Sequence, residues 1–215
     1  MTVRAHHMTS PSMTIAVFDF DGTLTYRDSL FPFIRMAVGH PRFFFGIFVL
    51  SPVLFGYAVK VIKNSDAKQA VLKHFFAGID HKTFQELGNK FAVQRLPSML
   101  RPEAMQRLRW HQQHGHQVII VSASLETYLQ PWAKMMQCGQ VIGSIIEVDE
   151  GHLTGRLSGK NCYGPEKVTR LERLLGKLNA YFMFAYGDSK GDRELLAAAD
   201  KMFFKSFTDS DDKNK

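Results

Sequence analysis

Two aspartates lie one residue apart, directly after an apolar run near the start of the chain. The run Ile-Ala-Val at residues 15–17 leads into Phe-Asp-Phe-Asp-Gly-Thr, in which the acids are Asp19 and Asp21. We expect a buried strand over residues 14–20, and alternate side chains of a strand point to the same side. The two carboxylates should therefore converge at the carboxyl end of this strand. Such a pair can supply a nucleophile or base, a proton donor and metal ligands.

Other polar groups follow apolar runs farther along the chain. Ser122 ends one run, Lys167 lies in the first turn of a predicted helix, and Asp188 and Asp192 follow a third run in Gly-Asp-Ser-Lys-Gly-Asp. The runs are typical of parallel strands buried on both faces, and they cover residues 14–20, 117–121, 181–186 and 201–204. Because ligands bind at the carboxyl ends of parallel strands, these polar groups are expected at one edge of one sheet.

Helical patterns separate the strands and complete an α/β pattern. Residues 103–114 and 165–175 read as helices, the second with Pro165 at its first position and Gly176 at its end. This alternation predicts a doubly wound parallel sheet. Residues 25–116 separate the first two strands, many more than a simple crossover needs, and their pattern predicts a helical cap. Residues 144–157 read as a β-hairpin.

Four segments in order resemble the motifs of one enzyme family. They are Asp-Phe-Asp-Gly-Thr at 19–23, Val-Ser-Ala-Ser at 121–124, Gly-Pro-Glu-Lys at 164–167 and Gly-Asp-Ser-Lys-Gly-Asp at 187–192. Together they resemble the haloacid dehalogenase-like phosphohydrolases. The resemblance implies a Rossmann-like core formed by residues 14–24 and 117–207, with residues 25–116 as the helical cap. The position of the cap is similar to that in subfamily IB, which includes phosphoserine phosphatase.

This resemblance implies a Mg²⁺-dependent phosphatase that works through an aspartyl-phosphate. Asp19 would be the nucleophile, and Asp21 would protonate the leaving group and then activate water. Asp19, Asp188 and the backbone carbonyl of Asp21 would hold the ion, with Asp192 as a further ligand or as an orienting residue. Asp192 could alternatively cap the helix that begins near Arg193.

The phosphate group would be held by a second set of residues. The resemblance implies that Ser122, the backbone amides near Ala123 and Lys167 bind its oxygens at the beginning of a helix. Ser122 could instead be a helix N-cap, with Ser124 as the competing cap or phosphate ligand. Lys167 could instead be a solvated helix residue.

Asp28 is the candidate residue for substrate specificity. Phosphoserine phosphatases carry a glutamate at the matching position and commonly an asparagine where this chain has Gly191. Asp28 could bind a substrate ammonium or hydroxyl, or cap the helix expected near Ser29. The predicted substrate is a phosphoserine- or histidinol-phosphate-like amino-alcohol phosphate, or a lipid phosphate monoester. The sequence at 164–173 is also similar to a bacterial subgroup that includes a phosphatidylglycerophosphate phosphatase.

Residues 43–59 form an uncharged, strongly apolar stretch. Ser51 and Pro52 look like an N-cap and a first helical residue, which would split the stretch into two short helices. One interpretation is a helical hairpin buried inside the cap. The other is an interfacial hairpin that touches membrane or a lipid tail, flanked by Arg42, Lys60 and Lys63. A membrane span is disfavoured, since it would thread the cap through the bilayer.

Composition limits the remaining function classes. The chain has 215 residues and a formal net charge of +7, which favours acidic partners. A nucleic-acid partner is not expected, because no basic stripe with interleaved aromatics appears. A phosphomutase or phosphotransferase on the same fold and a membrane-docked binding module are the alternative functions.

The remaining sequence features concern the cellular location of the protein and the two ends of the chain. Cys138 and Cys162 are the only cysteines, which favours a reduced, cytoplasmic protein. Peripheral contact with the inner membrane is the additional expectation for its location. Residues 1–12 carry no stretch of signal-peptide type, and Met8 and Met13 are alternative starts. The tails 1–12 and 208–215 are expected to be disordered. His111, His114 and His116 are expected to be solvated or structural.

Overall fold

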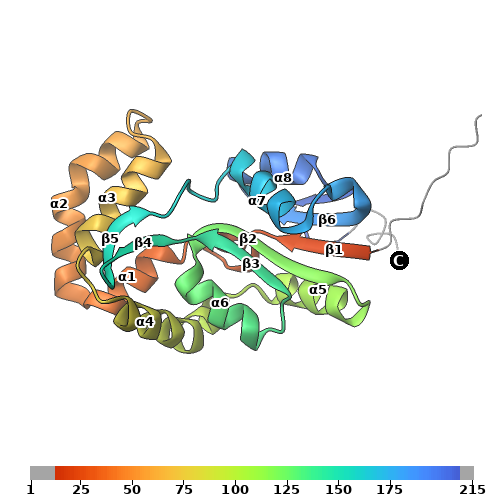
Figure 1. The fold of residues 1–215 in the computed structure, drawn as a ribbon, viewed down its shortest axis with the longest axis horizontal. Helices are drawn as coiled ribbons and strands as arrows, with labels where there is room; N and C mark the ends of the chain where they lie inside the picture. Colours follow the sequence, from red (N-terminus) through yellow and green to blue (C-terminus); the bar gives the residue numbers. More distant parts are fainter. Residues whose placement is uncertain (1–12, 209–215) are drawn as a thin grey trace, which may run out of the picture.

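The computed structural model describes residues 13–208. Five parallel strands form one sheet in the order β3-β2-β1-β6-β7. Their bounds are β1 Met13–Phe18, β2 Gln117–Leu125, β3 Gln140–Ser144, β6 Tyr181–Gly187 and β7 Lys201–Phe204. β1 lies in the middle, and all strands run toward the helices on the left of Figure 1. The predicted parallel α/β sheet is therefore confirmed.

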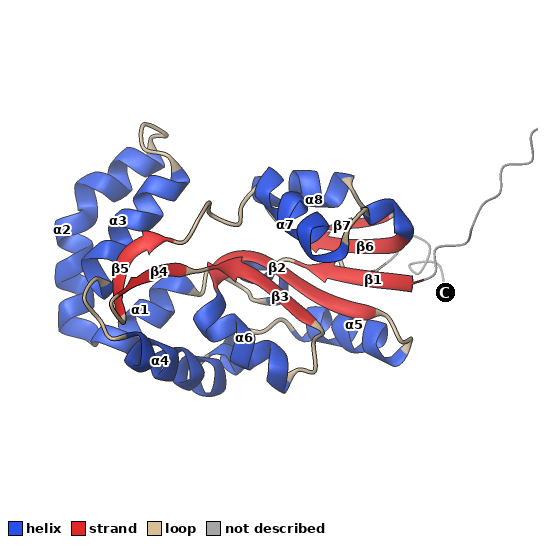
Figure 2. Cartoon of the chain, in the orientation of Figure 1, coloured by secondary structure: helices blue, strands red, loops and turns tan. Residues whose placement is uncertain are grey.

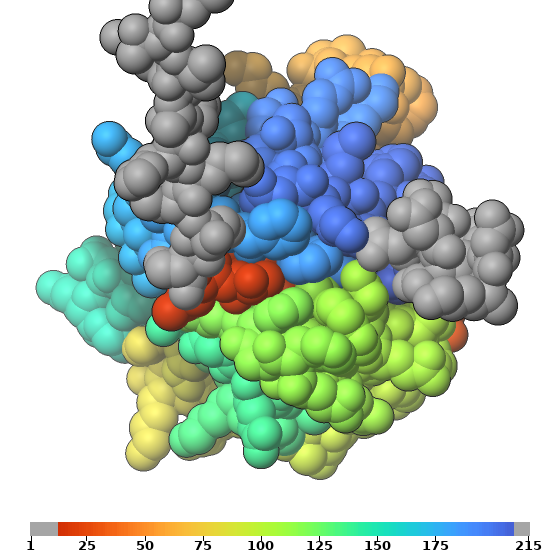
Figure 3. Space-filling model, turned by 90° about the vertical axis from the view of Figure 1, so that its right-hand side faces the viewer, coloured from red at the N-terminus to blue at the C-terminus, as the bar shows by residue number. Residues whose placement is uncertain are grey.

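Helices cover both faces of the sheet (Figure 2). α7 (Pro165–Leu175) and α8 (Arg193–Ala197) lie on one face, and α5 (Pro102–Gln113) and α6 (Glu126–Met135) lie on the other. The alternation along β1 matches this arrangement, because Val17 packs in one apolar cluster with Leu171 and Phe18 in the other with Leu108. Such burial on both faces explains the continuous apolar strands. In Figure 3, α5 (green) and the C-terminal segments (blue) lie on either side of β1 (red).

Two predicted strand ends need correction, and one strand was not predicted. β1 ends at Phe18 rather than at residue 20, because the chain turns at Gly22, which has a φ of 79°. β2 continues to Leu125 instead of ending at residue 121. The edge strand β3 was not predicted, since it is only five residues long and contains Gly143.

The insert between β1 and β2 is helical, as predicted. It contains α1 Leu30–Val38, α2 His40–Ala58, α3 Asn64–Phe76 and α4 His81–Gln94, followed by a short turn at Leu96–Met99 and then by α5. The predicted hairpin is also present, as β4 Ile146–Asp149 and β5 His152–Leu157. It joins the insert, because the backbone N–H of Gly78 donates to the carbonyl of Leu153 at 2.8 Å. We refer to α1–α4 with this hairpin as the cap.

The prediction of two short helices within residues 43–59 is wrong, since α2 is one helix of 19 residues with Pro52 inside it. Proline has no N–H to donate to the carbonyl four residues earlier. Here that acceptor is Phe48, and the hydroxyl of Ser51 donates to its carbonyl at 2.7 Å. The serine thus supplies the hydrogen bond that Pro52 cannot, and it is not a cap. The prediction of a buried hairpin is also wrong, because most of α2 is exposed.

Candidate active site

Asp19 lies at the first position after β1 and is held in place by the backbone. Its N–H donates to the carbonyl of Tyr186 on the neighbouring strand β6 at 2.9 Å. The chain then turns sharply at Gly22. A Cβ at Gly22 would lie 2.3 Å from a carboxylate oxygen of Asp188, so both its positive φ and its close neighbour require glycine. The first and fourth predicted motifs, which follow β1 and β6, are therefore packed directly against each other.

Lys167 is buried between two carboxylates. It lies in the first turn of α7, and its Nζ is 2.6 Å from Oδ1 of Asp19 and 2.6 Å from Oδ1 of Asp192. Burial alone would lower the pKa of Lys167, but the two carboxylates outweigh it and raise the pKa. The lysine is therefore charged at neutral pH. The alternative of a solvated helix residue is wrong.

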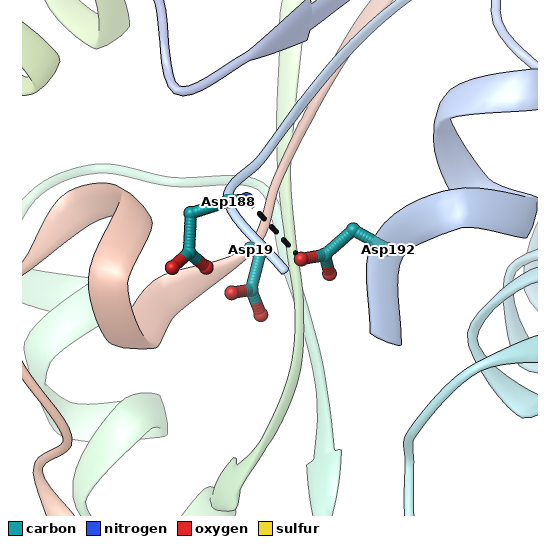
Figure 4. A group of neighbouring side chains, drawn as sticks. All are labelled: Asp19, Asp188 and Asp192. Atoms are coloured by element: carbon teal, nitrogen blue, oxygen red, sulfur yellow. Dashed lines mark hydrogen bonds between the residues drawn. The ribbon is translucent and has the colours of Figure 1, made fainter. Parts of the chain in front are cut away.

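Three acids converge at this point (Figure 4). Carboxylate oxygens of Asp19, Asp188 and Asp192 lie within 4.8 Å of one another. Asp192 is fixed by several hydrogen bonds. Its Oδ2 accepts from the N–H of Asp188 at 3.2 Å, from the N–H of Ser189 at 3.0 Å and from the hydroxyl of Ser189 at 2.9 Å. Asp188 is half-buried, and burial raises its pKa. Lys167 pairs with two of these three acids, and carboxylate oxygens are donors that suit Mg²⁺.

Asp21 has a different environment from Asp19. Its Oδ1 accepts from the N–H of Ser29 at 3.0 Å, and its Oδ2 accepts from the hydroxyl of Ser124. Both aspartates line the same cavity. Strand alternation is not the reason, because β1 ends before Asp19; the turn and these two serines position Asp21 instead.

The two aspartates also differ in how readily they ionise. Burial raises the pKa of Asp19 to about 6, with Lys167 opposing the shift. Burial and the nearby Asp28 raise the pKa of Asp21 to about 8, against the hydrogen bonds from Ser124 and Ser29. The pKa of Asp21 is therefore raised further than that of Asp19, so Asp21 keeps its proton to a higher pH. Neighbouring carboxyls with separated pKa values are typical of a nucleophile and an acid.

Ser122 and Ala123 line the cavity from β2. The hydroxyl of Ser122 accepts from the N–H of Ser124 at 3.2 Å. The alternative of a helix N-cap at Ser122 is wrong, because the extended chain continues to Leu125 and α6 begins only at Glu126. The phosphate-binding role of Ser122 and Ala123 stays a prediction.

A cavity of about 320 Å³ lies above these groups, between the sheet edge and the cap. Its lining includes the predicted residues Asp19, Asp21, Asp28, Ser122, Ala123 and Lys167, together with Leu30, Phe31, Leu54, Tyr57, Val71 and Lys68 from the cap. Asp188 and Asp192 are not part of this lining, and they lie on either side of Asp19 in Figure 4.

Lys68 of α3 is a site residue that the sequence did not indicate. Its Nζ donates to the carbonyl of Ala123, to Oγ of Ser144 at 3.1 Å and to Oδ1 of Asn161 at 2.9 Å. Burial lowers the pKa of Lys68 to about 8, although the nearby carboxyls of Asp21 and Asp28 oppose the shift. This lysine connects the cap to the core across the cavity.

Of the two predicted possibilities for Asp28, the helix cap is confirmed, and substrate binding stays a prediction. Oδ1 of Asp28 accepts from the N–H of Leu30 at 2.9 Å and of Phe31 at 3.4 Å, so it caps the start of α1. It also lines the cavity. Burial raises its pKa.

The histidines lie outside the cavity lining. His111 is buried in the core, with Nε2 2.8 Å from the hydroxyl of Tyr186 and Nδ1 2.7 Å from Nδ1 of His116. Burial lowers the pKa of His111 to about 3. The structural interpretation of His111 is confirmed.

Comparisons with known proteins place this site among related enzymes. Residues 16–197 match the model of the haloacid dehalogenase-like hydrolases. Protein CicA of Caulobacter vibrioides is 34% identical over 90% of this chain and 86% of its own length. The histidinol-phosphatase of Neisseria meningitidis is 26% identical over 59% of this chain and 61% of its own.

A solved structure has the same fold. A phospho-aspartyl intermediate analogue of phosphoserine phosphatase superposes with a TM-score of 0.60 at 15% identity, covering 89% of this chain and 86% of the other. The region matched by the family model contains all four predicted motifs and covers most of the chain. This protein belongs to the haloacid dehalogenase-like hydrolase family, and its family and relatives support phosphatase activity.

Proposed function

We propose that the protein is a Mg²⁺-dependent phosphatase that hydrolyses a phosphate monoester through an aspartyl-phosphate on Asp19. The observation that carries this proposal is the geometry of two carboxyls: Asp19 lies 2.6 Å from Lys167, and Asp21 lines the same cavity. The pKa of Asp21 is raised further than that of Asp19, which favours a charged nucleophile beside a protonated acid. These are the two protonation states that the first half of the reaction requires.

In the first step, a carboxylate oxygen of Asp19 forms a bond to phosphorus and the bond to the leaving alkoxide breaks. Asp21 donates its proton to that alkoxide. In the second step, Asp21 takes a proton from water, the water oxygen attacks phosphorus, and the acyl-phosphate bond to Asp19 breaks. Inorganic phosphate and free Asp19 result. Lys167 stays charged throughout and offsets negative charge beside Asp19.

The acidic cluster fits a divalent ion, since it offers carboxylates in excess of the one lysine that pairs with them. Asp19, Asp188 and the backbone carbonyl of Asp21 would hold Mg²⁺, and Asp192 would orient the loop and Lys167. When bound, the ion would offset charge on the phosphoryl oxygens. Ser122 and the amide near Ala123 would hold those oxygens on the other side.

The proposal is tested by trapping the intermediate. Protein incubated with a labelled aryl phosphate and Mg²⁺ is quenched and treated with hydroxylamine, which cleaves acyl phosphates. We expect bound label that hydroxylamine releases in the wild type, and at least about a thousandfold lower turnover with no label in Asp19→Asn. The exposed Asp149→Asn serves as the matched control. EDTA should abolish turnover and Mg²⁺ should restore it.

Two results would contradict the mechanism. Near-normal turnover of Asp19→Asn would remove the nucleophile from this position. Full activity in EDTA would remove the metal from the reaction. Transfer of the label to an added sugar phosphate, without release of free phosphate, would instead identify a phosphomutase.

For the leaving group, we propose the alcohol of a small amino-alcohol phosphate. Asp28 lines the cavity and offers a carboxyl to an ammonium group. The named histidinol-phosphatase relative agrees with this substrate class. A lipid phosphate monoester is the second candidate, which the apolar wall of Leu30, Phe31 and Leu54 favours. Phosphate release from phosphoserine, histidinol phosphate and a lysophosphatidic acid distinguishes the two classes.

A further inference from the structure

The outer face of α2 is an aromatic surface that the protein itself leaves uncovered. Phe48 and Phe55 are 75% and 69% exposed, and the remaining exposed apolar residues of this face are Phe44, Phe45, Val49 and Val59. At 100° per residue the five positions within α2 lie along one side of the helix, and Val59 directly follows its last residue. Contiguous exposed apolar patches of this kind mark sites of interaction. We call this surface the α2 face.

The opposite side of α2 is firmly attached to the cap. Leu50 is buried, and a Cβ at Gly46 would lie 2.3 Å from the ring of Phe75 on α3. α2 contacts both α1 and α3 with this inner side and forms the outer layer of the cap in Figure 1. The α2 face is therefore a fixed part of the folded surface.

Among the described residues, α2 is the one helix long and apolar enough to cross a membrane by length and composition. A span would have to detach its inner side from α1 and α3 and bury that side in lipid as well. Because those contacts are tight at Gly46, the structure favours a helix that lies along the membrane surface.

The charges around the α2 face select the partner. Residues 29–65 contain no Asp or Glu, and their charged side chains are Arg35, Arg42, Lys60 and Lys63. Arg42 and Lys60 lie near the two ends of the helix. An aromatic surface with basic flanks complements a bilayer with anionic headgroups. A second copy of this chain is disfavoured, since a symmetric pair would bring the same basic flanks together.

We propose that the α2 face docks the protein on the surface of an anionic lipid bilayer, with its aromatic side chains in the interface and its basic flanks on the headgroups. Leu54 and Tyr57 of the same helix line the catalytic cavity. Docking would therefore hold that cavity next to the bilayer. The proposal concerns the surface alone and does not depend on the phosphatase mechanism.

Sedimentation of the full chain with vesicles tests the proposal. One set of vesicles contains phosphatidylcholine alone, and the other contains phosphatidylglycerol as well. We expect the wild type to sediment with the anionic vesicles and Phe48→Gln/Phe55→Gln to lose at least about tenfold in partitioning. Phe204→Gln, an exposed phenylalanine on β7, is the matched control and should bind as the wild type does.

A second variant separates charge from apolar insertion. Arg42→Gln/Lys60→Gln should weaken binding to anionic vesicles and leave the weak binding to phosphatidylcholine unchanged. Circular dichroism and turnover of a soluble aryl phosphate report that each variant is folded. A wild type that stays in the supernatant with both vesicles would overturn the proposal. So would a dimer that Phe48→Gln/Phe55→Gln converts to a monomer without any vesicle binding.

Discussion

The catalytic edge of the sheet and the α2 face depart from ordinary burial in opposite directions. At the sheet edge, charged groups are buried: Asp19, Lys167 and Asp192 are almost inaccessible to water. On α2, phenylalanines such as Phe48 and Phe55 stand in water. Each arrangement is unfavourable unless something compensates it.

The compensation differs between the two regions. The buried charges are matched within the chain, since Lys167 lies 2.6 Å from each of two carboxylates and the hydrogen bonds of Asp192 are complete. The aromatics of α2 have no such partner among the described residues on their exposed side. The first region is therefore built for chemistry inside the protein, and the second for contact with something outside it.

Replacing Lys167, the cation that pairs with the buried carboxylates, should give the largest loss of stability. In Lys167→Met the carboxyls of Asp19 and Asp192 remain buried without their cation, so we expect the free energy of unfolding to fall by about 3–5 kcal/mol. Guanidinium unfolding at pH 8 measures this, because that pH lies above the pKa of about 6 of Asp19. Lys160→Met, at an exposed lysine, should change stability by less than about 0.5 kcal/mol. Equal stability of the two variants would show that the buried charges are not compensated by Lys167.

The sequence predicted the cluster of buried charges at the sheet edge better than it predicted the cap. Asp19, Lys167, Asp188 and Asp192 each follow a strand or begin a helix of a parallel sheet, and the geometry of the sheet brings such positions together. Lys68 could not be found this way. It lies in the middle of α3, and its role depends on acceptors from three distant segments.

The continuity of α2 was missed for a local reason. A serine–proline pair is typical of a helix start, and the sequence alone does not show that Ser51 donates to the carbonyl of Phe48 instead. The sequence left the exposure of α2 open between a buried and an interfacial interpretation, because an apolar stretch alone does not separate the two. Which side of such a helix is covered depends on the neighbouring helices.

A smaller effect is expected from Gly22→Ala, which tests how closely the catalytic turns are packed. The added methyl would meet the carboxylate of Asp188 at 2.3 Å, and alanine is strained at a φ of 79°. We expect a loss of about 1–3 kcal/mol in the free energy of unfolding and a larger proportional loss of turnover. Gly176→Ala has a φ of 81° but no neighbour within 4 Å, so it should lose stability without a comparable loss of turnover.

A pH-dependent effect is expected at His111, which is buried at the end of α5. The pKa of His111 is lowered to about 3 in the folded state, below the value of about 6.5 in the unfolded chain. The unfolded chain therefore binds more protons between these values, and stability present above pH 6.5 is lost as the pH falls. From pH 7.5 to pH 5.5 this loss should be about 1 kcal/mol. In His111→Gln, chemical unfolding at both pH values should show a smaller loss, and an unchanged loss would assign the effect to other groups.

The smallest change in stability is expected on the α2 face, where an exposed phenylalanine can be compared with a buried one of the cap. Phe48→Gln removes an aromatic ring that is 75% exposed, so the free energy of unfolding should change by less than about 0.5 kcal/mol. Phe33→Ala removes a fully buried ring of the cap, and about 3–5 kcal/mol should be lost. Thermal and chemical unfolding of both variants measures the difference. If Phe48→Gln lost as much as Phe33→Ala, Phe48 would be supporting the fold itself. A stable Phe48→Gln protein that no longer binds anionic vesicles would instead assign the ring to the bilayer, because its contribution would then appear only when a partner is present.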